Sequence, residues 1–147
     1  MARQSEAHIA AAHRLLTQER VTQGPASERA AAAGRVFDTV LQSLAPIVGE
    51  AGVRALFARS VKLARPQFPC LEQMTPGTWA SNSQIAEQLV DCLNELESAA
   101  LSEVTNHLLA VFFGLMTTFI GEHLVWQVMT KAFPGIGEPF WRRLSDE

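Results

Sequence analysis

The chain has 147 residues, of which 48% are hydrophobic and 18% are charged, and its formal net charge is −3. This composition suits one globular domain whose own core stabilises it, and the slightly acidic balance supplies no basic field for nucleic acid or anionic lipid. The two cysteines, Cys70 and Cys92, are too few and too unpatterned for a disulfide framework or a zinc site, so we expect reduced thiols.

The first predicted element is a modest N-terminal helix. Residues 4–21 are rich in alanine and place Ile9, Ala12 and Leu16 on one side, until Gly24 and Pro25 break the pattern. Within residues 1–24 this helix is a candidate mobile arm. The charged Glu6 interrupts the apolar region that a secretory signal would need, so we expect a cytoplasmic protein.

Two further helices follow in the first half of the chain. Apolar residues recur at helical spacing from an N-cap at Ser27 until Pro46, which forbids easy continuation of the helix. The stripe resumes from Val53 to Ala64 and ends where Pro66 disfavours helical geometry in the residue before it.

Residues 66–82 are predicted to form a long loop, because they hold three prolines and a Pro-Gly turn. Loops of this length are uncommon in compact domains and are often functional. Here the apolar side chains are predicted to anchor the loop to the core, and the alternative is a lid over a binding pocket; these side chains are Phe68, Leu71, Met74 and Trp79. A fourth helix is opened by Asn82 or Ser83 and carries apolar residues as far as Leu96.

The most unusual stretch is Val104 to Gly121, which contains no Asp, Glu, Lys or Arg. On a helical wheel its apolar residues cover an arc of about 200°. The remaining wedge includes a seam of small side chains at spacings of three and four, formed by His107, Ala110, Gly114, Thr117 and Gly121. Small residues in such rows let another helix come close, so the seam predicts a close helix neighbour.

This stretch is at the lower limit of length for crossing a bilayer. Thr105, Asn106 and His107 polarise one end, however, which leaves Leu108 to Gly121 as the apolar part. A segment of that length is more typical of a buried core helix, and no basic cluster on either flank would set an orientation in a membrane. We therefore expect a helix buried in protein and no membrane association.

A break is predicted at Gly121. If the helix continued straight, its next apolar residues, among them Val125 and Met129, would lie opposite the first apolar arc. A straight run to Phe133 would also span about 46 Å, longer than the roughly 38 Å diameter expected for the domain. We predict that Glu122 lies in the first turn of a new helix, where a negative charge is favoured. The alternative is a straight helix whose halves face different partners, one of them a second subunit.

No motif for catalysis, for a cofactor or for a metal is found. The sequence has no Gly-x-Ser-x-Gly, P-loop or dinucleotide fingerprint. Glu103 with His107, and Glu122 beside His123, do not form the Glu-x-x-His pairs of a di-iron bundle. We therefore expect no catalytic residue, no bound metal and no cofactor.

Residues 47–60, "IVGEAGVRALFARS", resemble a helix-turn-helix with Ala51 to Val53 as the turn. Recognition helices place polar and basic tips on one face, whereas Arg54, Arg59 and Lys62 are scattered around this helix. Arg59, Lys62 and Arg65 also suit the negative end of a helix dipole. DNA binding is therefore only a third hypothesis.

These patterns predict an all-α domain over residues 1–147, an irregular bundle of five or six helices around a central helix at about 103–120. The leading functional hypothesis is a non-catalytic interaction or regulatory module that forms a homodimer through its apolar C-terminal helices; exposed parts of these helices, or the N-terminal arm, would meet the partner. The alternative is a sensor or carrier of small apolar ligands, whose pocket would be lined by Phe57, Phe112, Phe113, Met116 and Trp126.

The C-terminal tail, residues 134–147, contains Phe140, Trp141 and Arg142. We expect this tail to dock on its own domain, and the alternative is a peptide for a partner protein.

Overall fold

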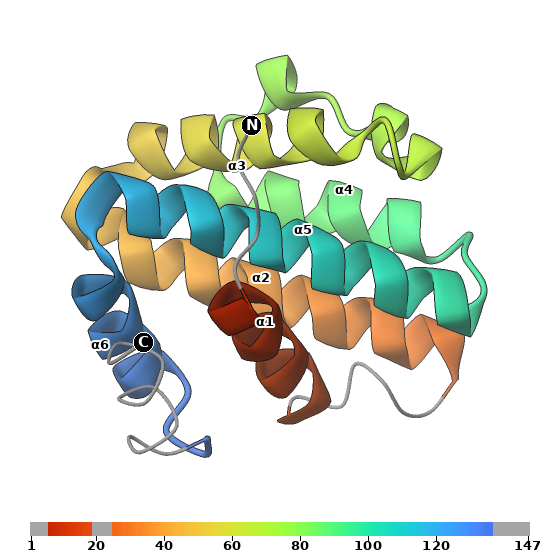
Figure 1. Cartoon of the computed structure of the whole chain (residues 1–147). Coiled ribbons are helices and arrows are strands. Elements are labelled where there is room, and N and C mark those ends of the chain that lie inside the picture. Colours follow the sequence, from red (N-terminus) through yellow and green to blue (C-terminus); the bar gives the residue numbers. More distant parts are fainter. Residues whose placement is uncertain (1–5, 19–24, 137–147) are drawn as a thin grey trace.

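The computed structural model describes residues 6–18 and 25–136, and these form six α-helices and two short 3-10 helices without a strand. The α-helices are α1 (Glu6–Gln18), α2 (Ala26–Val48), α3 (Glu50–Ala64), α4 (Asn82–Leu93), α5 (Ser98–Ile120) and α6 (Glu122–Ala132). The 3-10 helices are η1 (Pro69–Gln73) and η2 (Pro76–Thr78). The predicted all-α fold is confirmed (Figure 1).

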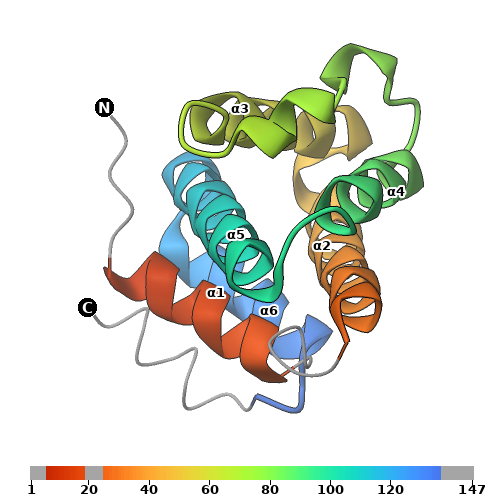
Figure 2. The ribbon, with the colours of Figure 1, turned by 90° about the vertical axis from the view of Figure 1, so that its right-hand side faces the viewer.

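Helix α5 lies at the centre of the bundle, as the sequence predicts. It contacts α1, α2, α3 and α6, while α2 packs against both α3 and α4. In the view of Figure 2, α3 lies above α5 and α1 lies below it, while α2 and α4 lie beside α5 on the right. The wide apolar arc explains this position, because a helix that is apolar over more than half of its circumference must bury several faces.

The predicted break at Gly121 is confirmed. Gly121 has φ 93° and ψ 147°, a backbone conformation that ends α5 and lets α6 begin at Glu122. The change of direction turns Val125, Trp126 and Met129 into the core, while His123 faces solvent. If α5 had continued straight through Gly121, the apolar side chains would point away from the core and His123 would point towards it.

The corner between α2 and α3 has the same construction. Gly49 has φ 85° and ψ 152°, donates to the Ala45 carbonyl at 2.7 Å, and accepts from the Val53 N–H at 2.9 Å. In both corners two apolar residues precede the glycine and a glutamate follows it at the start of the next helix, where its charge suits the helix dipole. The two corners lie at the same end of the bundle (Figure 1).

Helix α2 differs from the prediction at both ends. Its N-cap is Pro25, so Ser27 already lies in the first turn. The helix continues past Pro46 to Val48, because a proline in the last turn removes only one hydrogen bond while the Gly49 N–H still closes the helix. Residues 51–53, expected as the turn of a helix-turn-helix, lie instead within the first turn of α3.

Helix α5 begins at Ser98, five residues before the predicted start. The guanidinium of Arg29 in α2 is 5% exposed and donates to the Ser98 carbonyl at 3.0 Å and to the Ser102 hydroxyl. This contact between residues distant in the sequence stabilises the first turns of α5, which apolar periodicity alone does not mark.

Helix α1 packs on α5 through Ala11, Ala12, Leu15 and Leu16, which are fully buried. Ile9, which we expected on the apolar side, is instead 48% exposed. Ala12 and Leu16 are buried as expected, and only Ile9 was assigned to the wrong side, because an alanine-rich helix offers several apolar faces of similar strength.

Residues 66–82 contain the two 3-10 helices rather than an irregular loop. Leu71, Met74 and Trp79 are buried, and Phe68 is half-buried, as expected for anchors. The Arg65 side chain at the end of α3 donates to the Met74 carbonyl at 2.7 Å and to the Leu71 carbonyl at 3.4 Å. These bonds secure the segment on the core.

The aromatic part of the tail, Phe140 to Arg142, lies outside the described residues.

Candidate functional site

The five residues predicted to line an apolar pocket all lie in the core, where each is at most 1% exposed. The rings of Phe57 and Phe112 pack edge to face with centroids 5.6 Å apart, and those of Phe113 and Trp126 do so at 5.5 Å. Such pairs are typical of close-packed interiors. The ligand pocket stays a prediction, and it would require these rings to separate.

The predicted seam on α5 lies against α1 at Gly114 and Thr117. A Cβ added at Gly114 would meet the His8 ring at 3.6 Å, which is ordinary van der Waals contact, so the neighbour there is a side chain. The Thr117 hydroxyl lies 3.0 Å from His8 Nε2, and Ala110 is buried. His107, at the start of the seam, instead packs its ring against Phe68, with centroids 5.1 Å apart.

His8 is the most enclosed ionisable group that α1 contributes, with 7% of its surface exposed. Burial lowers its pKa, and the Glu122 carboxylate, 3.9 Å from Nε2, raises the pKa by less. Burial also lowers the pKa of His107. Both imidazoles are therefore favoured in the neutral form, which suits structural hydrogen bonding better than a permanent cationic site.

Cys92 is a buried thiol whose S–H donates to the Cys70 carbonyl at 3.0 Å. Burial, together with Cys70 and Glu95 beside it, raises the pKa of Cys92 to about 12. Because the thiolate is the nucleophile, this thiol is unreactive at neutral pH. The arrangement offers no nucleophilic cysteine at position 92.

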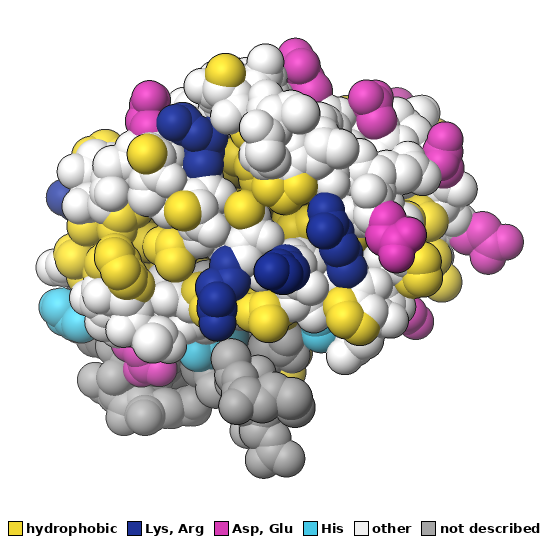
Figure 3. Space-filling model, turned by 90° about the horizontal axis from the view of Figure 1, so that it is seen from above, with side chains coloured by type: hydrophobic (Ala, Val, Ile, Leu, Met, Phe, Trp, Pro, Cys, Tyr) yellow, Lys and Arg dark blue, Asp and Glu magenta, His cyan; other side chains and the backbone are white. Residues whose placement is uncertain are grey.

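Among the residues that the structure describes, the most exposed large apolar side chain is Phe119, which is 65% exposed one turn beyond the half-buried Leu115 and beside the half-buried Ile120. We call these three residues the α5 corner surface. They lie at the end of the bundle that holds both glycine corners, where Ile47 is also 39% exposed. Hydrophobic side chains gather at this end of the face viewed from above (Figure 3). The sequence pattern assigned Phe119 to the buried arc, because it could not show where α3 and α6 stop covering α5.

The basic side chains of α3 lie on the same face of the molecule, towards its centre (Figure 3). Arg59 and Lys62 are exposed, whereas Arg65 is half-buried and donates to main-chain carbonyls. Residues 51–53 lie in the first turn of α3, so the corner between the two helices is at Gly49 and not at the turn that the sequence pattern indicated.

Two hollows lie along α2 and α4, on residues that we did not single out. The first, of about 470 Å³, lies between the end of α2, the start of α3 and the start of α4. The second, of about 460 Å³, continues along the α2–α4 groove, and Ser83 lines both. The sequence marked Pro46, Asn82 and Ser83 among these lining residues, and only as helix ends.

Among the residues that the structure describes, no three His, Cys, Asp or Glu side chains are placed to hold a metal ion. Helix α5 is long and apolar enough to cross a membrane by length and composition, but 56% of its most apolar window is buried inside the fold. Core helices of water-soluble proteins have the same properties.

Comparison of the chain with known protein families, curated proteins and solved structures gives no match. The functional argument therefore depends on the residues and surfaces described above.

Proposed function

We propose that this chain is a non-catalytic interaction module that forms a homodimer through the α5 corner surface. The observation that supports the proposal is Phe119, a phenylalanine with 65% of its surface exposed on the central helix, whose other phenylalanines, Phe112 and Phe113, are fully buried. Full burial of a phenylalanine side chain is worth about 1.5–3 kcal/mol, so a contact that covers this ring gains most of that free energy.

The chemistry of the surface favours a second copy of the chain as the partner. Val104 to Gly121 contains no charged residue, so a partner must also present an uncharged apolar surface to avoid leaving a charge unpaired. The same surface on a second copy meets this condition. A two-fold axis through it would pair Phe119 with its counterpart in a closed, self-complementary contact.

The position of the surface supports the same proposal. Phe119 lies in the last turn of the central helix, and the α5–α6 corner that follows is fixed by Gly121 and the buried Val125 and Trp126. A side chain held by a rigid helix loses little conformational freedom on binding, which lowers the entropic cost of association.

The test is the dimer dissociation constant, measured by analytical ultracentrifugation for the wild type and for Phe119→Asp. We expect a wild-type dimer at tens of micromolar and a dissociation constant raised at least about tenfold by the aspartate, because a buried charge without a partner is costly. Leu63→Asp is the matched control, since Leu63 is 43% exposed in the last turn of α3, far from the glycine corners.

A wild-type chain that sediments as a monomer at tens of micromolar would contradict the proposal. So would equal weakening by both substitutions, because that result would show a general effect of charge on solubility.

A further inference from the structure

The groove between α2 and α4 combines two open surface hollows with an excess of acidic side chains. Its two hollows, of about 470 and 460 Å³, are each within the size range of small-ligand sites and are joined at Ser83. Glu50 lines the first hollow, and Asp38, Glu87 and Asp91 line the second, where Arg35 is the one basic residue in either lining.

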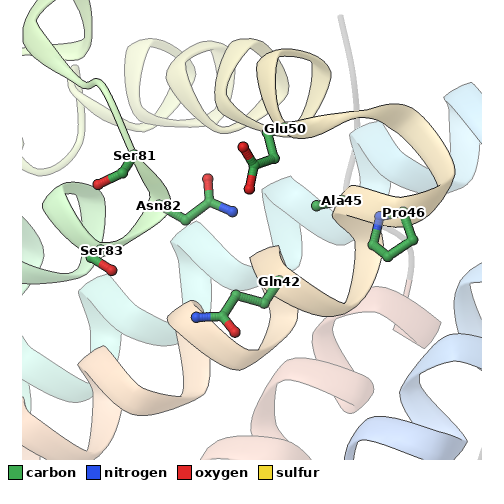
Figure 4. Close-up of a pocket in the computed structure, with 7 residues that line it drawn as sticks. All are labelled: Gln42, Ala45, Pro46, Glu50, Ser81, Asn82 and Ser83. Carbon is green, nitrogen blue, oxygen red and sulfur yellow. The ribbon is translucent and has the colours of Figure 1, made fainter.

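Asn82 supplies the observation that points to a ligand. Only 8% of this residue is exposed, and within the described part of the chain its Oδ1 is buried without a hydrogen-bond partner. Its side chain extends into the first hollow, towards the space between Glu50 and Gln42 (Figure 4). Because no hydrogen bond fixes that oxygen, the amide can turn about its last torsion to present it to a bound group.

Asp38 repeats this feature in the second hollow. Its Oδ2 accepts from Gln42 Nε2 at 2.8 Å, whereas its Oδ1 is buried and has no hydrogen-bond partner among the described residues. An unpaired buried acceptor costs free energy, and two of them along one groove are unusual in a folded protein. Asn82 Oδ1 and Asp38 Oδ1 therefore each require a hydrogen-bond donor.

The backbone adds a further acceptor. The Gln42 carbonyl cannot receive the usual helical hydrogen bond, because the residue four positions later is Pro46, which has no N–H. Gln42 and Pro46 both line the first hollow. The start of α4 contributes a partial positive charge there, but the full negative charge of Glu50 is larger than the partial charge of a helix end.

We propose that this groove binds a cationic nitrogen group, a guanidinium or an alkylammonium, through Glu50, Asn82 and Asp38. Such groups carry several N–H donors and a positive charge, which complement unpaired acceptors and carboxylates. The group can belong to a small free amine or to an arginine or lysine side chain of a peptide.

The test is a titration of ¹⁵N-labelled protein, monitored by NMR, with two probes: agmatine and an acetylated, amidated nonapeptide that contains three arginines. We expect shifts confined to residues around the two hollows. Tighter binding of agmatine would identify a small-amine site, whereas tighter binding of the peptide would identify a protein partner. Shifts spread over all acidic surfaces, or a stronger response to inorganic phosphate than to either probe, would overturn the proposal.

Two variants and a control test the residues. Glu50→Gln and Asn82→Ala should each weaken binding of the better probe about tenfold, the effect of losing one charge-assisted hydrogen bond. Asn82→Ala should not lower the melting temperature, since it removes an unpaired buried acceptor. Glu103→Gln, which neutralises an exposed glutamate on α5, should leave binding unchanged. Equal weakening by Glu103→Gln would show general attraction to an acidic protein and contradict a defined site.

The same titration on Phe119→Asp separates this inference from the proposed dimer. We expect unchanged binding, because the groove is formed by α2, α3 and α4, whereas Phe119 lies on α5. Loss of binding in this variant would show that the groove depends on dimerisation and would contradict an independent site.

Discussion

The His8 imidazole connects three parts of the bundle. It lies 3.0 Å from the Thr117 hydroxyl on α5, 3.9 Å from the Glu122 carboxylate on α6, and near the Trp126 ring, with centroids 6.2 Å apart. The helix that carries it contributes four fully buried apolar side chains to the core. The protonation state of one residue therefore affects how α1 is held on the bundle.

Stability should fall as the pH is lowered through the histidine range. Burial lowers the pKa of both His8 and His107 below the ordinary value of 6.5, so the unfolded chain binds more protons than the folded one in that range. The stabilisation is complete above about pH 6.5 and is lost as the pH falls below it. Urea unfolding from about pH 7.5 to about pH 5.5 measures this change.

His8→Gln should reduce that pH dependence, because glutamine can still bond to Thr117 but does not titrate. His13→Gln is the matched control, since His13 lies on the exposed side of the same helix. A pH dependence that is unchanged in His8→Gln would show that His8 is not enclosed as described.

At the scale of helices, the two glycine corners set where one helix ends and the next begins. Gly49 and Gly121 share a positive φ near 90° with an extended ψ, a conformation that is essentially confined to glycine. A Cβ added at either position would meet no atom within 4 Å, so the strain of a substitution is entirely in the backbone.

Gly121→Ala should lower the free energy of unfolding by about 1–3 kcal/mol, as should Gly49→Ala, because alanine is strained in this backbone conformation. Chemical denaturation measures the loss. Gly77→Ala is the control: it also has open space around it but lacks a positive φ, so its effect should stay within about 0.5 kcal/mol. If Gly121→Ala matched Gly77→Ala, the chain would not turn at 121 in the described way.

At Gly114, in contrast, we expect substitution by alanine to stabilise the protein. Gly114 lies inside α5 with room for a methyl group, so Gly114→Ala should raise the free energy of unfolding by about 0.5–1 kcal/mol. Destabilisation by this substitution would show that α1 packs more closely on α5 than a 3.6 Å contact implies.

The Arg65 side chain holds the segment between α3 and α4 in place through hydrogen bonds. This side chain bonds to the carbonyls of Leu71 and Met74, so Arg65→Met should destabilise the protein by about 1–3 kcal/mol and speed amide hydrogen exchange in η1 and η2. Arg59→Met, at an exposed position of the same helix, is the control. Unchanged exchange in η1 would contradict this role.

Periodicity and glycine placement predicted the helices well, because burial on one face leaves a direct mark on the sequence. The early start of α5 was missed because it depends on Arg29, which is distant in the sequence. The 3-10 helices were missed because they depend on Arg65 and on Gln88, whose Oε1 accepts from both Thr75 and Trp79. Such polar contacts follow from the fold and leave no periodic signal.

At the scale of the whole molecule, the central position of α5 was predictable but the identity of its neighbours was not. Its apolar arc requires cover on several sides, yet nothing in the pattern says that cover stops at Phe119. The α2–α4 groove was also beyond prediction, since Gln42, Glu50 and Asn82 meet only after three helices are placed. Single polar residues at helix ends look like ordinary caps in a sequence.

The two proposed surfaces lie on different helices and differ in chemistry. The α5 corner surface is uncharged and suits another apolar surface, whereas the α2–α4 groove is acidic and suits a cation. Together the two proposals give a module that would pair with itself through α5 and bind a basic group between α2, α3 and α4.

The most direct test of the central claim is an isotope-filtered NOE experiment on a mixture of ¹³C-labelled and unlabelled chains. The account predicts intermolecular contacts between the Phe119 ring of one chain and the Leu115, Phe119 and Ile120 side chains of the other. Intermolecular contacts that leave Phe119 out, or none at a concentration of hundreds of micromolar, would contradict it.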